Sequence, residues 1–189
     1  MDLNIVYFFN QLGRGTFIEP LTEISSSVPF LVAFIILFLA LPFIFNKKKG
    51  IKVFGAVIIA FLVQLLILEF LLKEFIPFRE RPYIAFPEEI TAVGRKLSNS
   101  SLPSSHMSVS LVFLTVYFYY YKRYWPVFVV MALSMGFIRM HMGMHYPSDV
   151  LIGAGLGIVF GALGVFVIER VEKKKMVLYN SKVKKKVGG

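Results

Sequence analysis

The chain has 189 residues, of which 57% are hydrophobic, and it carries a formal net charge of +10 with no cysteine. The lack of cysteine excludes a disulfide framework and thiolate chemistry. The apolar residues occur in long runs and the mean hydropathy is +0.69, which favours an integral membrane protein over a soluble domain. The positive charge lies mostly between these runs without a nucleic-acid-binding motif, so we expect no nucleic-acid partner.

Apolar runs define the expected architecture, an all-α integral membrane protein. Residues 1–26 include a short apolar segment, too short to span, that we expect to lie in the membrane interface. Five runs that follow are long enough for transmembrane helices, and they cover about 28–45, 51–72, 107–121, 126–144 and 150–168. We therefore predict one helical domain over residues 1–168 and a basic tail over residues 169–189.

The distribution of lysine and arginine predicts how this bundle is oriented. Basic residues gather between the first and second spans, between the third and fourth, and after the fifth. The excess of positive charge in cytoplasmic loops puts these three regions, including the tail, in the cytoplasm. The connection formed by residues 73–105 then lies on the outer side.

Ionisable and hydroxyl side chains form three clusters on that outer side. Such residues near a bilayer usually mark function, and here they are Lys73, Arg79 and Arg81, then Ser104, Ser105 and His106, then Arg139, His145 and Asp149. A helix that starts after Pro103 would present free N–H groups to an anion. Two histidines among several cations can divide the roles of nucleophile and acid, which fits phosphoryl transfer.

The third cluster resembles a motif of the type 2 phosphatidic acid phosphatase superfamily, the membrane lipid phosphatases whose fold and site are shared with vanadium haloperoxidases. That motif reads Ser-Arg, five residues, His, three residues, Asp. Arg139, His145 and Asp149 have this spacing, and Ile138 replaces the serine.

The other two clusters resemble the remaining motifs of that family. Pro103, Ser104, Ser105 and His106 follow the pattern Pro-Ser-Gly-His, with serine in place of glycine. The first motif is a lysine, six residues, then Arg-Pro. In this chain seven residues separate Lys73 from Arg81.

The resemblance implies a role for each matched residue. His145 would attack phosphorus to form a phosphohistidine, Asp149 would orient His145, and His106 would protonate the leaving oxygen. The phosphate would be held by cationic and hydroxyl side chains, namely Lys73, Arg81, Ser104, Ser105 and Arg139. Because the first motif is one residue longer here, whether Lys73 reaches the phosphate itself or Arg79 shares this task stays open. The resemblance implies neither a metal nor another cofactor.

The resemblance also implies a lipid substrate with a phosphate or diphosphate head, reached at the outer face of a bacterial inner membrane. A short five-span chain with an interfacial N-terminal helix is most similar to the undecaprenyl diphosphate phosphatases. Lipid A 1-phosphate is the closest rival substrate, and phosphatidylglycerophosphate and phosphatidate stay open.

Two other functions compete with this one, and one structural question stays open. His141, His145 and Asp149 could ligate zinc in a metal-dependent hydrolase, although Met142 stands where the glutamate of a His-Glu-x-x-His motif belongs. A transporter of anionic lipids is the non-enzymatic alternative. Glycines at every fourth position from 153 to 161 indicate close helix contact, within one chain or between two, so the oligomeric state stays open.

Overall fold

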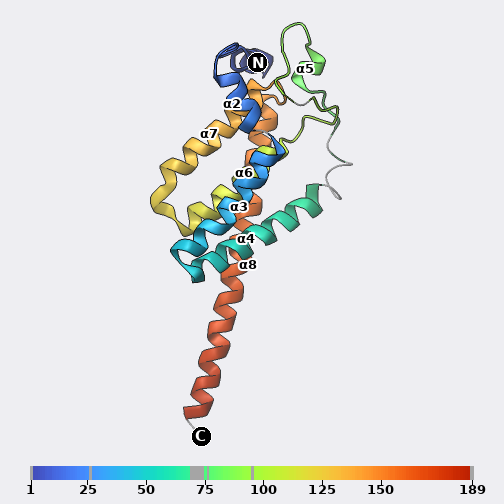
Figure 1. Cartoon of the computed structure of the whole chain (residues 1–189). Coiled ribbons are helices and arrows are strands. Elements are labelled where there is room, and N and C mark those ends of the chain that lie inside the picture. The colour runs from blue at the N-terminus through green and yellow to red at the C-terminus, as the bar shows by residue number, and fades with distance from the viewer. Residues whose placement is uncertain (1, 26, 69–74, 76, 95, 188–189) are drawn as a thin grey trace.

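The computed structural model describes residues 2–25, 27–68, 75, 77–94 and 96–187, and the regular structure in those ranges is helical throughout. This confirms the expected all-α fold. Figure 1 shows the helices side by side in a bundle, with the N-terminus, α2 and α5 gathered at one end. The C-terminus lies far beyond the opposite end.

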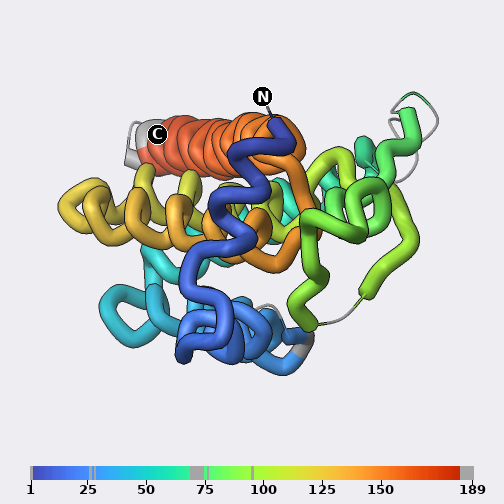
Figure 2. The backbone as a smooth tube through the Cα atoms, turned by 90° about the horizontal axis from the view of Figure 1, so that it is seen from above, coloured from blue at the N-terminus to red at the C-terminus, as the bar shows by residue number. Residues whose placement is uncertain are grey.

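The segment expected at the membrane interface forms two short helices. α1 (Asp2–Gln11) and α2 (Ile18–Ser25) are separated by a turn that includes Gly13, whose φ is 73°. α1 contacts α7 and α8, and α2 contacts α3 and α7. Figure 2 shows this N-terminal segment lying across one end of the bundle.

The first two long helices meet at a sharp corner. α3 (Val28–Phe45) has the predicted bounds, and the Ser27 side chain accepts a hydrogen bond from the Phe30 N–H at 3.4 Å. α4 (Lys47–Leu65) starts four residues before the predicted position of Ile51. Asn46 explains this early start, because its side chain accepts a hydrogen bond from the Lys49 N–H and caps the new helix.

The remaining helices follow the loop that contains α5 (Pro82–Ala85). They are α6 (Ser105–Tyr120), the 3-10 turn η2 (Lys122–Tyr124), α7 (Trp125–His141) and α8 (Pro147–Val187). α8 runs well past the predicted end of its span at Ile168. Hydropathy marks where an apolar run stops, whereas the lysine-rich sequence that follows still favours a helix.

Within the described ranges, two helices are each long and apolar enough to cross a membrane, namely α4 with the turn after it to Leu68, and α8 as far as Val183. α2 and α3, which meet at an angle of 64°, make a third span if they are counted together. α6 and α7 have 16 and 17 residues. The predicted count of five spans therefore stays a prediction.

α8 is the central helix, and it packs against both α6 and α4. A Cβ atom on Gly153 would lie 2.5 Å from the Ser104 carbonyl oxygen, and one on Gly157 would lie 2.3 Å from that of Ser108. The glycine face thus lets α6 approach the α8 backbone within this one chain.

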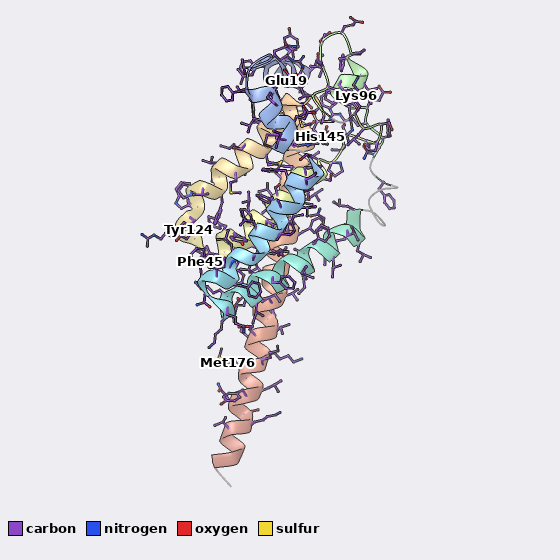
Figure 3. All side chains as sticks on the ribbon, in the orientation of Figure 1. Glu19, Phe45, Lys96, Tyr124, His145 and Met176 are labelled. Atoms are coloured by element: carbon purple, nitrogen blue, oxygen red, sulfur yellow. The ribbon has the colours of Figure 1, made fainter. Side chains whose placement is uncertain are left out.

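The two ends of the bundle differ in character. In Figure 3, His145 lies near Glu19 and Lys96 at one end, and Phe45 and Tyr124 lie at the other. The corner after Phe45 and the turn before Trp125 carry basic residues. The described residues of the three motifs and the basic loops therefore occupy opposite ends of the bundle.

Candidate active site

Three helices and the loops before α5 and α8 supply the matched residues that the structure describes. Arg81 immediately precedes α5, His106 lies in the first turn of α6, and Arg139 lies in the last turn of α7. His145 belongs to the loop between α7 and α8, and Asp149 to the first turn of α8. Lys73, the predicted phosphate ligand of the first motif, lies outside the described residues.

The loop before α8 holds His145 in a fixed orientation. Gly143 has a φ of 67°, which favours glycine, and a Cβ there would lie 2.8 Å from Cγ2 of Ile90. His145 is 2% exposed, and its Nδ1 lies 2.7 Å from the Ser101 carbonyl oxygen. Because that oxygen only accepts hydrogen bonds, Nδ1 carries the proton and Nε2 is unprotonated, with a lone pair that can accept a hydrogen bond.

Asp149 is buried and engages two other groups. One carboxylate oxygen accepts a hydrogen bond from Arg79 at 2.8 Å, and the other accepts one from the Tyr146 N–H at 2.9 Å. The second oxygen lies 3.9 Å from Nδ1 of His145, beyond hydrogen-bond distance. The direct hydrogen bond that orients His145 is therefore to Ser101, and Asp149 holds the loop backbone at the neighbouring Tyr146 N–H.

Arg81 joins the outer loop to the site. Its side chain donates to the Asn99 carbonyl at 3.1 Å, to the Asn99 side chain at 2.8 Å and to the Met144 carbonyl at 3.0 Å. One terminal nitrogen lies 3.4 Å from Nε2 of His145. Burial lowers the pKa of Arg81 from its ordinary value, but a guanidinium stays charged near neutral pH. Arg81 therefore places a positive charge beside the unprotonated imidazole nitrogen and donates a long hydrogen bond to it.

Arg139 and Ser104 are buried without full hydrogen bonding. Arg139 is 3% exposed, and its Nε has no hydrogen-bond partner among the described residues. A terminal nitrogen approaches only the sulfur of Met142, at 3.9 Å. Ser104 is fully buried, and its hydroxyl likewise lacks a partner in the described part of the chain. Unsatisfied buried donors are costly, so this arrangement favours an anion that would satisfy them.

His106 shares the electrostatic environment of His145. His106 lies in the first turn of α6, one residue before the predicted third span. Burial, and then the charges of Arg139 and Arg81, lowers the pKa of His106 to about 4. Burial and the same two arginines lower the pKa of His145 well below its usual value. The same two cations thus act on both imidazoles. The second and third motifs meet at a backbone hydrogen bond of 3.2 Å, from the Ser104 N–H to the Asp149 carbonyl.

Arg79 and Ser105 differ from the other predicted phosphate ligands. The Arg79 guanidinium forms ion pairs with Asp149 at 2.8 Å and Asp2 at 3.2 Å. It also covers the ring of Tyr146, with 3.9 Å between its Cζ and the ring centroid. Ser105 follows the buried Ser104 but is exposed. The acidic partners of Arg79 leave less of its charge for a phosphate than Arg81 and Arg139 offer.

His141 makes a contact away from these groups. Its Nδ1 lies 3.0 Å from the Thr22 hydroxyl, so its ring joins α7 to α2. Its backbone carbonyl accepts a hydrogen bond from Asn10 at 2.7 Å. Among the described residues, no three histidine, cysteine or acidic side chains are placed to hold a metal ion. His141 therefore has a structural role in the bundle.

The main groups that sequence reasoning missed are Ser101 and Asn99. The carbonyl of Ser101 orients His145, and Asn99 binds Arg81 with both its carbonyl and its side chain. Asn99 is a short polar residue in an irregular loop, and it carries no signal of its own. The contribution of Ser101 is a backbone atom, which no sequence motif encodes.

Comparison with known proteins agrees with this arrangement. The PAP2 superfamily matches residues 49–173 of this chain. Bacitracin transport permease protein BcrC of Bacillus licheniformis is 27% identical over 88% of this chain and 79% of that protein. Undecaprenyl-diphosphatase BcrC of Bacillus subtilis is 32% identical over 46% of this chain and 44% of that protein. A lipid A 1-phosphatase of Rhizobium johnstonii is 34% identical over 37% of this chain, but the match spans only 29% of that protein.

Two solved structures share the fold. LpxE of Aquifex aeolicus gives a TM-score of 0.66 at 23% identity, over 87% of this chain and 94% of that one. The PAP2-type phosphatidylglycerolphosphate phosphatase of Bacillus subtilis gives 0.63 at 21% identity, over 92% and 85%. The family match covers most of the chain and includes all the residues of the three motifs. The chain therefore belongs to the PAP2 superfamily, a family that includes membrane lipid phosphatases.

Proposed function

We propose that this protein hydrolyses a membrane lipid phosphate or diphosphate through a phosphohistidine on His145. The observation that carries the proposal is the pair of buried arginines, Arg81 and Arg139, beside His145 and His106. Among the described residues, neither arginine forms an ion pair. Buried cations without a counter-ion favour an anionic ligand, and the guanidinium group suits phosphate oxygens.

The proposed reaction has two steps. The Nε2 lone pair of His145 attacks phosphorus, and the bond from phosphorus to the leaving oxygen breaks as His106 donates a proton to that oxygen. Water then attacks the phosphohistidine while His106 takes its proton, which releases phosphate and restores both imidazoles. His106 must be protonated for the first step. A bound phosphate opposes the charges of Arg81 and Arg139 and so favours that form.

Undecaprenyl diphosphate is the substrate that we propose, with the site at the outer face of a bacterial inner membrane. The relative matched over most of this chain is the Bacillus licheniformis BcrC, and the Bacillus subtilis BcrC is called an undecaprenyl-diphosphatase. Lipid A 1-phosphate is the alternative, supported by a match to a shorter part of this chain. Phosphatidylglycerophosphate and phosphatidate complete the set to be tested.

Replacement of His145 tests the mechanism. Asparagine keeps a side-chain donor for the Ser101 carbonyl but removes the nucleophile, so we expect phosphate release to fall by about 1,000-fold or more. The assay uses the full chain in detergent with each of the four lipids. A wild-type protein given radiolabelled substrate and quenched quickly should retain acid-labile phosphate, and His145→Asn should retain none.

His141→Asn is the matched control. His141 lies four residues earlier and binds Thr22, so this variant should keep most of its activity. Full activity in His145→Asn would remove the proposed mechanism.

Loss of activity with a chelator, restored by zinc, would favour the metal-dependent alternative. Inhibition by vanadate without metal dependence would favour the phosphohistidine mechanism. Movement of lipid without phosphate release in proteoliposomes would favour a transporter.

A further inference from the structure

The Arg79 side chain joins three parts of the candidate active site. One terminal nitrogen donates hydrogen bonds to the Asp149 carboxylate at 2.8 Å and to the Ser148 hydroxyl at 2.7 Å, both in the first turn of α8. The other terminal nitrogen donates to the Asp2 carboxylate of α1 at 3.2 Å. The guanidinium also covers the ring of Tyr146, in the loop before α8. Its planar fork therefore ties α1 and that loop to the start of α8.

The backbone of Arg79 contacts the segment that orients His145. The Arg79 N–H donates a hydrogen bond to the Ser100 hydroxyl at 3.1 Å, and the Arg79 carbonyl accepts one from the Ser101 N–H at 2.8 Å. Ser101 is the residue whose own carbonyl lies 2.7 Å from Nδ1 of His145. Arg79 thus reaches the hydrogen-bond acceptor of His145 through its backbone. Its side chain reaches the carboxylate that holds the next residue, Tyr146.

Asp2 holds the guanidinium of Arg79 from the side opposite to α8. Its carboxylate accepts hydrogen bonds from both Ser148 and Arg79. The hydrogen bond from Ser148, with a smaller contribution from Arg79, lowers the pKa of Asp2 from its ordinary value, so this carboxylate is charged at neutral pH. α1 contacts α8, and the N-terminus lies beside α8 in Figure 2. The N-terminal helix therefore supplies one of the two anions that fix Arg79.

The other two arginines of the candidate site differ from Arg79. Arg81 and Arg139 are each 3% exposed, and neither forms an ion pair among the described residues. The Arg79 side chain is 32% exposed and forms two ion pairs, with Asp2 and Asp149. Buried cations without a counter-ion favour an anionic ligand, whereas the charge of Arg79 is balanced within the protein. Two of the arginines therefore suit a phosphate, and the third suits support of the loop.

We propose that Arg79 is a positioning residue for His145 rather than a phosphate ligand, and that Asp2 holds Arg79 in place, so that α1 completes the active site. This proposal rests on the proposed function, because it concerns the same nucleophile. It requires both terminal nitrogens of Arg79, since one holds Asp149 and the other holds Asp2. A lysine has a single terminal nitrogen and cannot reproduce this fork.

Arg79→Lys tests the first half of the proposal, because it keeps the charge and removes the fork. The full chain in detergent is assayed with the lipid phosphate that the wild type hydrolyses, and inorganic phosphate is used as a competitive inhibitor. We expect kcat to fall by about tenfold or more, because a misplaced nucleophile slows the chemical step. The Ki for inorganic phosphate should stay close to that of the wild type.

Arg81→Gln is the comparison for this measurement, because it removes a proposed phosphate ligand and should raise the Ki for inorganic phosphate. An increase of similar size in Arg79→Lys would make Arg79 a phosphate ligand and overturn the proposal. An unchanged kcat in Arg79→Lys would also overturn it. A wild-type protein that releases no phosphate from any of the four lipids would instead remove the proposed function.

A double-mutant cycle between Asp2 and Arg79 tests the second half. Asp2→Ala should lower kcat with little change in the Ki for inorganic phosphate. It should cause little further loss when Arg79→Gln is already present, because Asp2 acts through Arg79. Glu19→Ala is the matched control, since the Glu19 carboxylate accepts a hydrogen bond from the exposed Gly15 N–H of the same N-terminal segment, and its kcat should be unchanged.

Asp2→Ala also guards against misfolding of the Arg79 variants, because its change lies at the partly exposed start of α1. Independent losses from Asp2→Ala and Arg79→Gln, which multiply in the double variant, would show that the two residues do not act together. Equal losses in Asp2→Ala and Glu19→Ala would show a general effect of the N-terminal segment. Either result would overturn the role proposed for Asp2.

Discussion

His145 donates its Nδ1 hydrogen bond to a backbone carbonyl, and this choice of acceptor affects its chemistry. A neutral carbonyl stabilises an imidazolium less than a hydrogen-bonded carboxylate would. The nearby carboxylate of Asp149 accepts hydrogen bonds from Arg79 and the Tyr146 backbone instead. Two further arginines disfavour a proton on the ring. His145 is thereby kept neutral, which is the form that the proposed attack on phosphorus requires.

The low pKa of His145 predicts the acid side of the pH profile. The neutral form persists as the pH falls below 6.5, so kcat/KM, which reports the free enzyme, should start to fall only at a lower pH. Arg81→Gln removes one charge that lowers this pKa and should move the acid limb to higher pH, while also weakening phosphate binding. The measurement is kcat/KM against pH for both proteins with one substrate, so that titration of the substrate affects both profiles alike.

Arg79→Gln provides a comparison for that experiment. Arg79 interacts mainly with acidic side chains and is not among the groups that lower the pKa of His145. The acid limb of the kcat/KM profile should therefore lie closer to that of the wild type in Arg79→Gln than in Arg81→Gln. Identical acid limbs in the wild type and Arg81→Gln would contradict the assignment of the limb to His145.

For single residues, the sequence predicts which side chains form the candidate site better than it predicts which backbone atoms contact them. The spacing of Arg139, His145 and Asp149 indicated the cluster that the structure brings together. The pairing of Arg79 with Asp2 was not predicted, because the two residues are far apart in the chain and no spacing rule relates them. The hydrogen-bond acceptor for His145 is the backbone carbonyl of Ser101. Because every residue has such a carbonyl, no residue type in the sequence marks this one.

The close contact between α6 and α8 links a helix face to the active site. Gly153 allows the Ser104 carbonyl to approach the α8 backbone, and the Ser104 N–H donates to the Asp149 carbonyl at 3.2 Å. Ser104 begins the helix whose first turn carries His106. The absence of a side chain at position 153 therefore sets the position of the second motif relative to the third.

Gly153→Ala tests this link. Its Cβ would lie 2.5 Å from the Ser104 carbonyl oxygen, so α6 must shift. We expect a loss of about 1–3 kcal/mol in the free energy of unfolding and a fall in kcat. Gly155 lies on the same helix, and a Cβ there would meet nothing within 4 Å, so Gly155→Ala should be neutral or stabilising by up to about 1 kcal/mol. Thermal unfolding in detergent measures the change in stability, and phosphate release measures the change in kcat. Equal results for Gly153→Ala and Gly155→Ala would refute the link between the α6–α8 contact and the candidate site.

The predicted elements show what hydropathy can and cannot determine. It predicted the bounds of α3 because a capping serine and a polar corner enclose an uninterrupted apolar run. It placed the start of α4 too late, since the lysines at 47–49 are typical of a loop although Asn46 caps them into the helix. It ended the fifth span at Ile168, where the apolar run ends but the helix does not.

The orientation of the whole molecule in the membrane is a separate prediction. The chain has no cysteine, so single cysteines can be labelled one at a time. Lys96, exposed near the active-site end, and Ser181, exposed on the far part of α8, are suitable positions. A membrane-impermeant maleimide should label Lys96→Cys in intact spheroplasts and Ser181→Cys only after lysis. The reverse pattern would place the site in the cytoplasm.

The start of α1 touches the start of α8. Asp2 accepts hydrogen bonds from Ser148 and Arg79, and Arg79 also holds Asp149. A purification tag or fluorescent fusion joined ahead of α1 would therefore crowd the groups around the proposed nucleophile. The far end of α8 lies at the opposite pole of the molecule. Attachment there is the better choice for immobilising an active preparation on a sensor surface.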